Sequence, residues 1–170
     1  MLRAIDRGKY QGGSKGRFWT LDPIDGTKGF LRGEQFAVCL ALIEDGVVRL
    51  GVMGCPNLPH HIDKPDGPRG SIFVAVEGQG AYWRPLDSAD LAETPVKVSG
   101  VTDVSAASFC ESVESGHSSQ SDAAQIALRL GITRPSVRMD SQCKYAAVAR
   151  GDADIYLRLP VSESYVEKIW

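Results

Sequence analysis

The chain has 170 residues, with 19 lysines and arginines against 21 aspartates and glutamates, and a formal net charge of −2. That balance provides no basic surface for nucleic acid, and no lysine- or arginine-rich run indicates attachment to a membrane. No apolar stretch approaches the roughly 20 residues of a membrane span, and the first residues lack the apolar core of a secretory signal. Any phosphorylated ligand would therefore have to be held by a few placed cations and a metal.

Four cysteines are scattered along the chain without a C-x-x-C spacing: Cys39, Cys55, Cys110 and Cys143. This pattern predicts neither a disulfide framework nor a zinc site. We therefore expect a reducing compartment, with the cytoplasm as the default location.

Strand-forming runs dominate the first half of the chain, after a polar start at 1–16. We expect strands at 18–21, 36–43, 47–51, 72–76 and 81–84. Asp45-Gly46 predicts a tight hairpin between the second and third strands, and Gly78-Gln79-Gly80 a turn between the last two. Residues 56–70 contain four prolines and two glycines, which predicts an irregular surface loop.

The polar stretch 86–95 predicts a boundary between two lobes, 1–95 and 96–170. In the second lobe we expect strands at 96–98, 106–111, 136–139 and 155–159, and helices at 120–130 and 142–150. Ser119 is the expected N-cap of the first helix, with Asp122 three positions on. Gly131 and Gly151 stand where helices end in a left-handed residue. Strands alternating with helices predict an α/β half within an α+β chain.

Two carboxylates, Asp22 and Asp25, stand three residues apart on either side of Pro23. The apolar residues before Asp22 predict a strand, and Pro23 cannot donate a ladder hydrogen bond, so we expect the strand to stop there. The two carboxylates and the Ile24 carbonyl would then line a tight turn, which is an oxygen donor set suited to Mg²⁺.

Gly26 and Thr27 would open the next helical turn, where free N–H groups attract an anion. A turn closed by an ordinary aspartate cap explains the same residues, because Asp, Pro and Gly are common in turns. Residue chemistry alone leaves both interpretations open.

The string D-P-I-D-G-T-K-G-F at 22–30 resembles the metal-binding signature of the lithium-sensitive, Mg²⁺-dependent phosphomonoesterases of the inositol monophosphatase superfamily. Its extension K-G-F-L-R-G-E-Q-F-A-V-C-L-A-L-I at 28–43 resembles more narrowly the 3'(2'),5'-bisphosphate nucleotidases of fungi and plants. The resemblance continues through 51–57, 116–119, 140–145 and 156–170. It implies the layered αβαβα sandwich of the inositol monophosphatase/fructose-1,6-bisphosphatase type, incomplete here.

The resemblance implies hydrolysis of 3'-phosphoadenosine 5'-phosphate to AMP and phosphate, a reaction linked to sulfate assimilation and salt tolerance, with the phosphosulfate analogue as a second possible substrate. Two or three Mg²⁺ ions would be held by Asp22, Asp25 and the Ile24 carbonyl, and would stabilise the attacking and leaving oxygens. The Thr27 hydroxyl would help to orient the water, and Gly26 and Thr27 would bind the phosphate. The implied partner is a small-molecule substrate, and the complete protein is expected to be a monomer.

Four more residues are candidate nucleotide ligands, and each has an ordinary alternative. His117 stands between a predicted strand and helix, where residue chemistry favours a solvated loop. Ser141 and Lys144 share one face of a helix start, although a capping serine with a surface lysine has the same spacing. Arg158 follows strand period and could face inward onto a phosphate or outward into solvent. The resemblance assigns all four to the nucleotide, whereas we expect Lys28 and Arg32 at the surface or behind the ligand-binding residues.

The resemblance also predicts acidic ligands that these residues lack: an aspartate and a glutamate before residue 1, and an aspartate directly after Trp170. We therefore expect a fragment with weak Mg²⁺ affinity and very low activity. A module that binds adenine bisphosphates without turnover is one alternative. An inositol phosphate phosphatase is another, although the K-G-F-L-R-G insert and the G-H-S-S segment argue against it.

Overall fold

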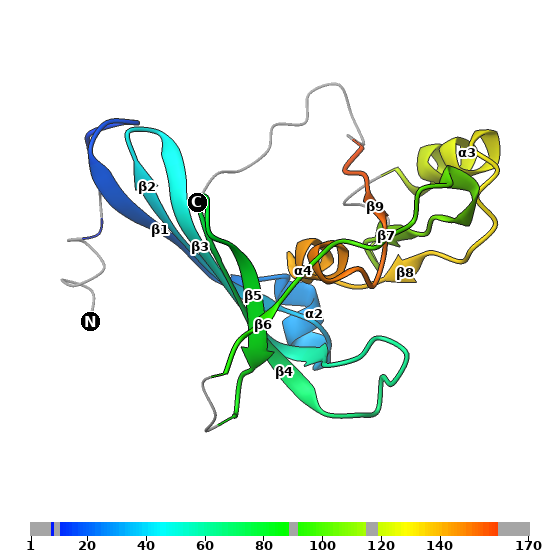
Figure 1. Cartoon of the computed structure of the whole chain (residues 1–170), viewed down its shortest axis with the longest axis horizontal. Helices are drawn as coiled ribbons and strands as arrows, with labels where there is room; N and C mark the ends of the chain where they lie inside the picture. Colours follow the sequence, from blue (N-terminus) through cyan, green and yellow to red (C-terminus); the bar gives the residue numbers. More distant parts are fainter. Residues whose placement is uncertain (1–7, 9–10, 89–91, 115–118, 160–170) are drawn as a thin grey trace.

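The structure is a computed structural model that describes residues 8, 11–88, 92–114 and 119–159. The first sheet of this part has six antiparallel strands in sequence order: β1 (Arg17–Asp25), β2 (Ala37–Glu44), β3 (Val47–Pro59), β4 (Arg69–Val76), β5 (Gly80–Pro85) and β6 (Thr94–Pro95). The second sheet is parallel, in the order β8 (Val137–Arg138), β7 (Phe109–Glu111) and β9 (Ile155–Tyr156). The helical elements are α2 (Thr27–Arg32), η1 (Val104–Ala106), α3 (Gln120–Arg129) and α4 (Cys143–Arg150). Figure 1 shows α2 and α4 between the two sheets.

The antiparallel sheet is a meander, because each strand pairs with the next strand in the sequence, and two of the connections are tight turns. Asp45 and Gly46 have φ angles of 50° and 80°, the left-handed pair that a two-residue hairpin needs. They join β2 to β3 with Glu44 opposite Val47. The hairpin expected from the sequence is confirmed, as is the turn around Gly78, where Gln79 N–H donates to the Val76 carbonyl.

The parallel sheet is built from two strand–helix–strand crossovers, through α3 and through α4. Ser119 caps α3 by accepting the N–H of Asp122 at 3.4 Å. Gly131 and Gly151 have φ angles of 71° and 81°, so the predicted helix ends are confirmed. Carboxyl ends of parallel strands meet at one edge of a sheet, and ligands of open α/β sheets bind at that edge. The segments that follow β7 and β8 therefore lie side by side.

β1 does not end at Pro23, and that expectation was wrong. The strand continues to Asp25, with an irregularity in its register against β2 between Asp22 and Asp25. β1 is the edge strand of its sheet, where a proline N can face away from the ladder. The irregularity turns the chain without ending the strand, as a β-bulge does.

Other boundaries also differ from expectation. The loop expected at 56–70 is confined to 60–68, because β3 reaches Pro59 and β4 begins at Arg69. Residues 96–98, all of them described, form no strand; the pairing with β5 is made by Thr94–Pro95 instead. The strand expected at 106–111 starts only at Phe109, after η1, and the one expected at 155–159 ends at Tyr156.

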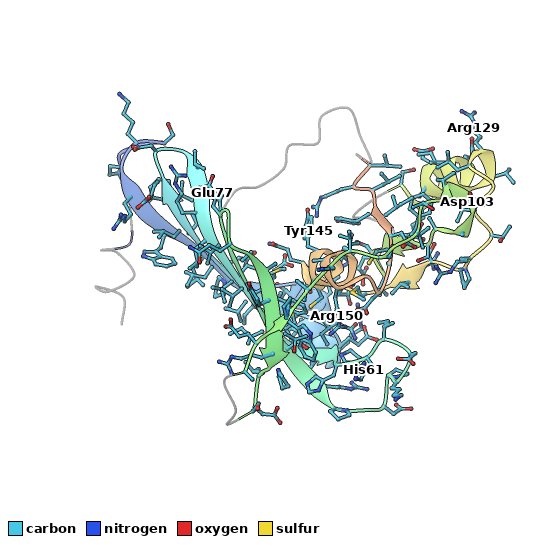
Figure 2. All side chains as sticks on the ribbon, in the orientation of Figure 1. His61, Glu77, Asp103, Arg129, Tyr145 and Arg150 are labelled. Carbon is cyan, nitrogen blue, oxygen red and sulfur yellow. The ribbon has the colours of Figure 1, made fainter. Side chains whose placement is uncertain are left out.

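The core lies where α4 meets both sheets. Its buried cluster consists mostly of small residues: Ala37, Cys55, Leu58, Phe73, Cys110, Met139, Cys143, Ala146, Ala147 and Ala153. Small side chains allow α4 to lie close to the strands. Arg150, at the end of α4, lies 5.8 Å from the Phe73 ring and 5.7 Å from the Trp83 ring (Figure 2). It also donates to the Pro59 carbonyl at 3.0 Å, which ties the helix to the antiparallel sheet.

Candidate functional site

The turn between β1 and α2 presents the predicted metal and phosphate ligands. Gly26 is the N-cap of α2 with a φ of 81°, a conformation that glycine adopts without steric cost. A Cβ at this position would lie 2.6 Å from the Cβ of Ser141. The predicted helical turn at Gly26 and Thr27 is thus present, and it lies directly against the start of α4.

Asp22 and Asp25 repel each other in this turn. Burial, and after it the charge of Asp25, raise the pKa of Asp22 above its ordinary 3.8, although a backbone hydrogen bond at Ile24 opposes the rise. A bound cation would relieve this repulsion. The Ile24 carbonyl is a third oxygen-bearing group in the same turn, and it accepts a long hydrogen bond of 3.5 Å from the Thr27 hydroxyl.

This donor set fits a hard divalent cation in part. Mg²⁺ commonly takes one or two protein carboxylates and fills its remaining positions with water and substrate oxygens. Over the described ranges, no group of three or more His, Cys, Asp or Glu side chains could hold a metal ion. The turn therefore offers two carboxylates and one carbonyl, which is enough for a site that completes its coordination with other oxygens.

The start of α4 closes onto this turn. Ser141 has a φ of 62°, an unfavourable conformation for a residue with a side chain, and such strain collects at functional sites. Its hydroxyl accepts the N–H of Cys143 at 3.2 Å. The N–H of Gln142, which lies between these two residues in the chain, donates to Asp25 Oδ2 at 2.5 Å. The structure therefore brings Ser141 next to Gly26 and Asp25, which the sequence placed more than a hundred residues apart.

Lys144 is buried, with 4% of the residue exposed. Its ammonium donates to the carbonyl of Ser141 at 2.7 Å and to that of Met139 at 3.4 Å, and lies 5.7 Å from the Tyr156 ring. Burial lowers the pKa of Lys144, and nearby anionic groups oppose that change only in part. The alternative of a surface lysine is therefore wrong, and the amine lies directly beneath Ser141.

The other two nucleotide candidates are His117 and Arg158. His117 lies outside the described residues. Arg158 is exposed and follows the end of β9, so the argument for an inward-facing strand arginine fails. It makes a hydrogen bond to Tyr156, which lowers the pKa of that phenol, while burial, the larger effect, raises it.

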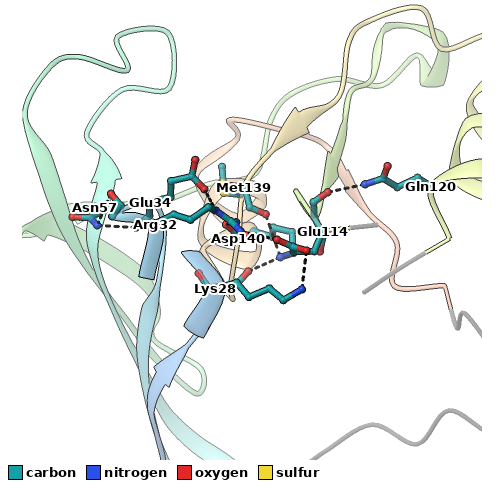
Figure 3. A network of polar contacts seen from close by, with 12 residues as sticks. Lys28, Arg32, Glu34, Asn57, Glu114, Gln120, Met139 and Asp140 are labelled. Carbon is teal, nitrogen blue, oxygen red and sulfur yellow. Dashed lines mark hydrogen bonds and ion pairs between the residues drawn. The ribbon is translucent and has the colours of Figure 1, made fainter. Parts of the chain in front are cut away.

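An ion-pair network behind the turn was not anticipated from the sequence (Figure 3). Lys28 Nζ lies 2.9 Å from Glu114 Oε2, and Arg32 Nη1 lies 2.6 Å from Glu114 Oε1. Arg32 also contacts Asp140 Oδ2 at 2.5 Å and Glu34 Oε2 at 2.7 Å. Lys28 and Arg32 on α2 are four residues apart, which places them on one helix face. This spacing is the one sequence feature that could have indicated a shared acidic partner.

Cys39 on β2 is opposite Asp22 in the strand register. Burial, together with the Asp25 and Asp22 charges, raises the pKa of this thiol to about 12. A thiol of this kind is protonated at neutral pH and is a poor nucleophile, so a covalent mechanism through Cys39 is disfavoured. A groove of about 430 Å³ begins at Asp22 and Gln142 and runs along the apolar sheet face to Phe73 and Ala149.

Several solved structures share the fold of this chain. The chain matches Mycobacterium tuberculosis SuhB with a TM-score of 0.60 at 23% identity, over 82% of this chain and 52% of that one. The Thermotoga maritima IMPase matches with a TM-score of 0.60 at 24% identity, over 89% and 50%. CysQ from Bacteroides thetaiotaomicron matches with a TM-score of 0.58 at 25% identity, over 90% and 54%. The fold is that of the inositol monophosphatase-type proteins.

The sequence gives the narrower assignment. The model of the inositol monophosphatase family matches residues 2–170, and the chain belongs to that family. It is 54% identical over 182 residues to a 3'(2'),5'-bisphosphate nucleotidase of Emericella nidulans, covering 100% of this chain and 52% of the relative. A 3'(2'),5'-bisphosphate nucleotidase 1 of Arabidopsis thaliana is 50% identical over 177 residues, covering 100% and 50%.

The chain thus spans about half the length of the curated relatives that it matches. Members of the family are generally metal-dependent and act on small molecules. Among the helices in the described part of the chain, none is both long and apolar enough to cross a membrane.

Proposed function

We propose that this chain carries the site of a Mg²⁺-dependent phosphomonoesterase that hydrolyses the 3'-phosphate of 3'-phosphoadenosine 5'-phosphate. The observation that carries the proposal is the closure of Ser141 and Gln142 onto the Asp22–Asp25 turn. It joins a pair of carboxylates to a hydroxyl, the N–H groups at the start of α2 and a buried ammonium at one place. The names of the relatives at 50–54% identity support the choice of substrate.

Asp22, Asp25 and the Ile24 carbonyl would hold the metal, as two or three Mg²⁺ ions in the complete site. When bound, Mg²⁺ supplies an activated water and stabilises negative charge on the phosphate oxygens. The Thr27 hydroxyl, which contacts the Ile24 carbonyl, would orient the water. Because two carboxylates alone repel each other, the chain's own residues favour a cation here even before substrate arrives.

Gly26, Thr27 and Ser141 would bind the phosphate through amides and hydroxyls, since a helix start with free N–H groups favours an anion. Lys144 would supply positive charge from beneath Ser141 and keep the neighbouring carbonyls in place. His117 and Arg158 would bind the rest of the nucleotide. We also propose residues 1–95 as a metal-binding lobe and 96–170 as a nucleotide-binding lobe, in a monomeric cytoplasmic protein serving sulfate assimilation and salt tolerance.

Calorimetry combined with phosphate release tests this proposal. The 170-residue chain is titrated with 3'-phosphoadenosine 5'-phosphate and, separately, with inositol 1-phosphate, with and without Mg²⁺. Binding of the nucleotide that Mg²⁺ strengthens, together with phosphate release, is the expected result. Equal or tighter binding of inositol 1-phosphate would overturn the substrate assignment.

A second candidate function is nucleotide binding without turnover. The observation that favours it is the small acidic set of the described chain, in which no three such side chains gather at one metal site. This function predicts nucleotide binding that does not depend on Mg²⁺ and no release of phosphate. The same titration therefore separates the two functions.

A further inference from the structure

We propose that Arg32 is a positioning residue: by holding Asp140, it fixes the Ser141–Gln142 backbone that orients the Asp25 carboxylate. Arg32 touches neither Asp25 nor the turn's oxygen donors, and it acts through three intervening residues, Asp140, Ser141 and Gln142. The consequence for metal binding rests on the proposed function, whereas the positioning of Asp25 rests on the contacts alone.

The first contact joins Arg32 to a buried carboxylate. The side chain of Asp140 is only 3% exposed, and Arg32 Nη2 lies 2.5 Å from its Oδ2. A buried carboxylate needs such a partner, because an unpaired charge away from water is strongly unfavourable. Gly29 permits the approach, since a Cβ there would lie 2.8 Å from the same oxygen and 2.2 Å from the Gln35 carbonyl oxygen.

The guanidinium of Arg32 is itself held in one orientation. Nη1 contacts Glu114 at 2.6 Å and Nε contacts Glu34 at 2.7 Å, so the three nitrogens face three different carboxylates (Figure 3). Glu114 follows β7 and Asp140 follows β8, which are neighbours in the parallel sheet. The planar guanidinium directs its N–H donors rigidly, so it suits this task better than a lysine ammonium, whose donors rotate freely.

Asp140 is followed directly in the chain by Ser141 and Gln142, so holding Asp140 also holds their backbone. Ser141, the next residue, is left-handed with a φ of 62°, and such a conformation persists only where the surroundings hold it. It carries the chain to Gln142, whose N–H donates to Asp25 Oδ2. Gly26 packs on the other side of Ser141. Release of Asp140 would let this backbone relax and free the Asp25 carboxylate to rotate.

A purely structural role for Arg32 makes different predictions. In that case Arg32 would only link α2 to the parallel sheet, and its loss would lower the melting temperature without a local change at Gln142. The two roles are separated by observing the Gln142 amide directly, and by a conservative variant that keeps the charge.

The experiment compares Arg32→Met and Arg32→Lys with wild type in amide hydrogen exchange resolved at Gln142, and in calorimetric titration with Mg²⁺ alone. Arg49→Met is the matched control, because Arg49 pairs with Glu77 and Glu44 at the far end of the antiparallel sheet. Arg32→Met is expected to speed exchange at Gln142 by about tenfold relative to Arg49→Met. It should also weaken Mg²⁺ binding by about tenfold, as loss of residues that orient metal ligands usually does.

Arg32→Lys is expected to lie between wild type and Arg32→Met in both measurements. Unchanged exchange at Gln142 in a folded Arg32→Met protein would overturn the proposal, as would an equal effect of Arg49→Met. If the wild-type chain binds no Mg²⁺, the proposed metal site fails, and the exchange rate at Gln142 still decides whether Arg32 positions Asp25.

Discussion

The main-chain N–H of Gln142 donates a hydrogen bond to the Asp25 carboxylate, although the two residues are 117 positions apart in the sequence. Asp25 ends the edge strand of the antiparallel sheet, and Gln142 precedes α4 of the parallel sheet. The bond therefore makes the geometry of the carboxylate pair depend on how the two halves of the chain pack. Substitutions at four positions test this packing and the residues around the carboxylate pair.

Gly26→Ala should destabilise the protein more than Gly33→Ala does. Both glycines are left-handed, with φ angles of 81° and 71°, so both changes carry a backbone cost of about 1 kcal/mol. Only at Gly26 would the new Cβ meet the Ser141 side chain, at 2.6 Å; at Gly33 the space is open. We expect about 1–2 kcal/mol of additional loss for Gly26→Ala, measured by urea unfolding. Equal losses would mean that Ser141 moves aside without cost.

Asp22→Asn should stabilise the metal-free protein at neutral pH. The folded-state pKa of Asp22 lies above its ordinary 3.8, so its charged form is disfavoured in the folded state. That cost is present above the raised pKa and disappears as the pH falls below 3.8. We expect the melting temperature to rise on the order of 1–2 °C at pH 7 and to match wild type near pH 3.

Added Mg²⁺ should reverse the order of the melting temperatures of wild type and Asp22→Asn. A ligand that binds only the folded state stabilises it by mass action, so wild type should gain melting temperature in Mg²⁺ while Asp22→Asn gains little. A melting temperature of Asp22→Asn below wild type without metal would contradict the repulsion between Asp22 and Asp25.

Lys144→Met should leave stability nearly unchanged and weaken nucleotide binding. Burial makes the charged amine unfavourable and lowers the pKa of Lys144, and Met fills a similar volume without that cost. Loss of the positive charge that Lys144 places near Ser141 should weaken binding of 3'-phosphoadenosine 5'-phosphate about tenfold or more. Urea unfolding and calorimetry measure the two effects, and unchanged affinity would remove Lys144 from the phosphate site.

Arg150→Met should be strongly destabilising, by about 3 kcal/mol, because it leaves the Asp152 carboxylate buried and unpaired. The Arg150 and Asp152 side chains are 9% and 11% exposed, with 2.6 Å between Nη2 and Oδ2. Arg49→Met removes an exposed ion pair with Glu77 and should cost under about 0.5 kcal/mol. Urea unfolding compares the two variants, and similar losses would show that Arg150 contributes no more than a surface residue.

The sequence predicted what depends on short-range pattern. The Asp45-Gly46 hairpin, the Ser119 cap and the left-handed Gly131 and Gly151 each follow from the backbone needs of one or two residues. The segment from Asp22 to Thr27 could also be singled out as a candidate site, because its oxygen donors lie within six positions; its role stays a prediction.

Long-range packing accounts for what the sequence did not reveal. Pro23 was expected to end β1, but its position on an edge strand could not be known before the sheet order was. Lys144 was weighed as a surface lysine, although the packing of α4 between two sheets buries it. The pairing of Arg32 with Glu114 and Asp140 spans 82 and 108 positions, and no local pattern encodes such partners.

The most direct test of the proposed function is phosphate release from 3'-phosphoadenosine 5'-phosphate labelled in its 3'-phosphate, by the wild-type chain and by Asp25→Asn. We predict release that requires Mg²⁺, slow in absolute rate, and at least about a hundredfold slower in Asp25→Asn. Release that is equal in the two proteins, or independent of Mg²⁺, would contradict a metal site at Asp22 and Asp25. Tight nucleotide binding with no release would instead establish the binding function without catalysis.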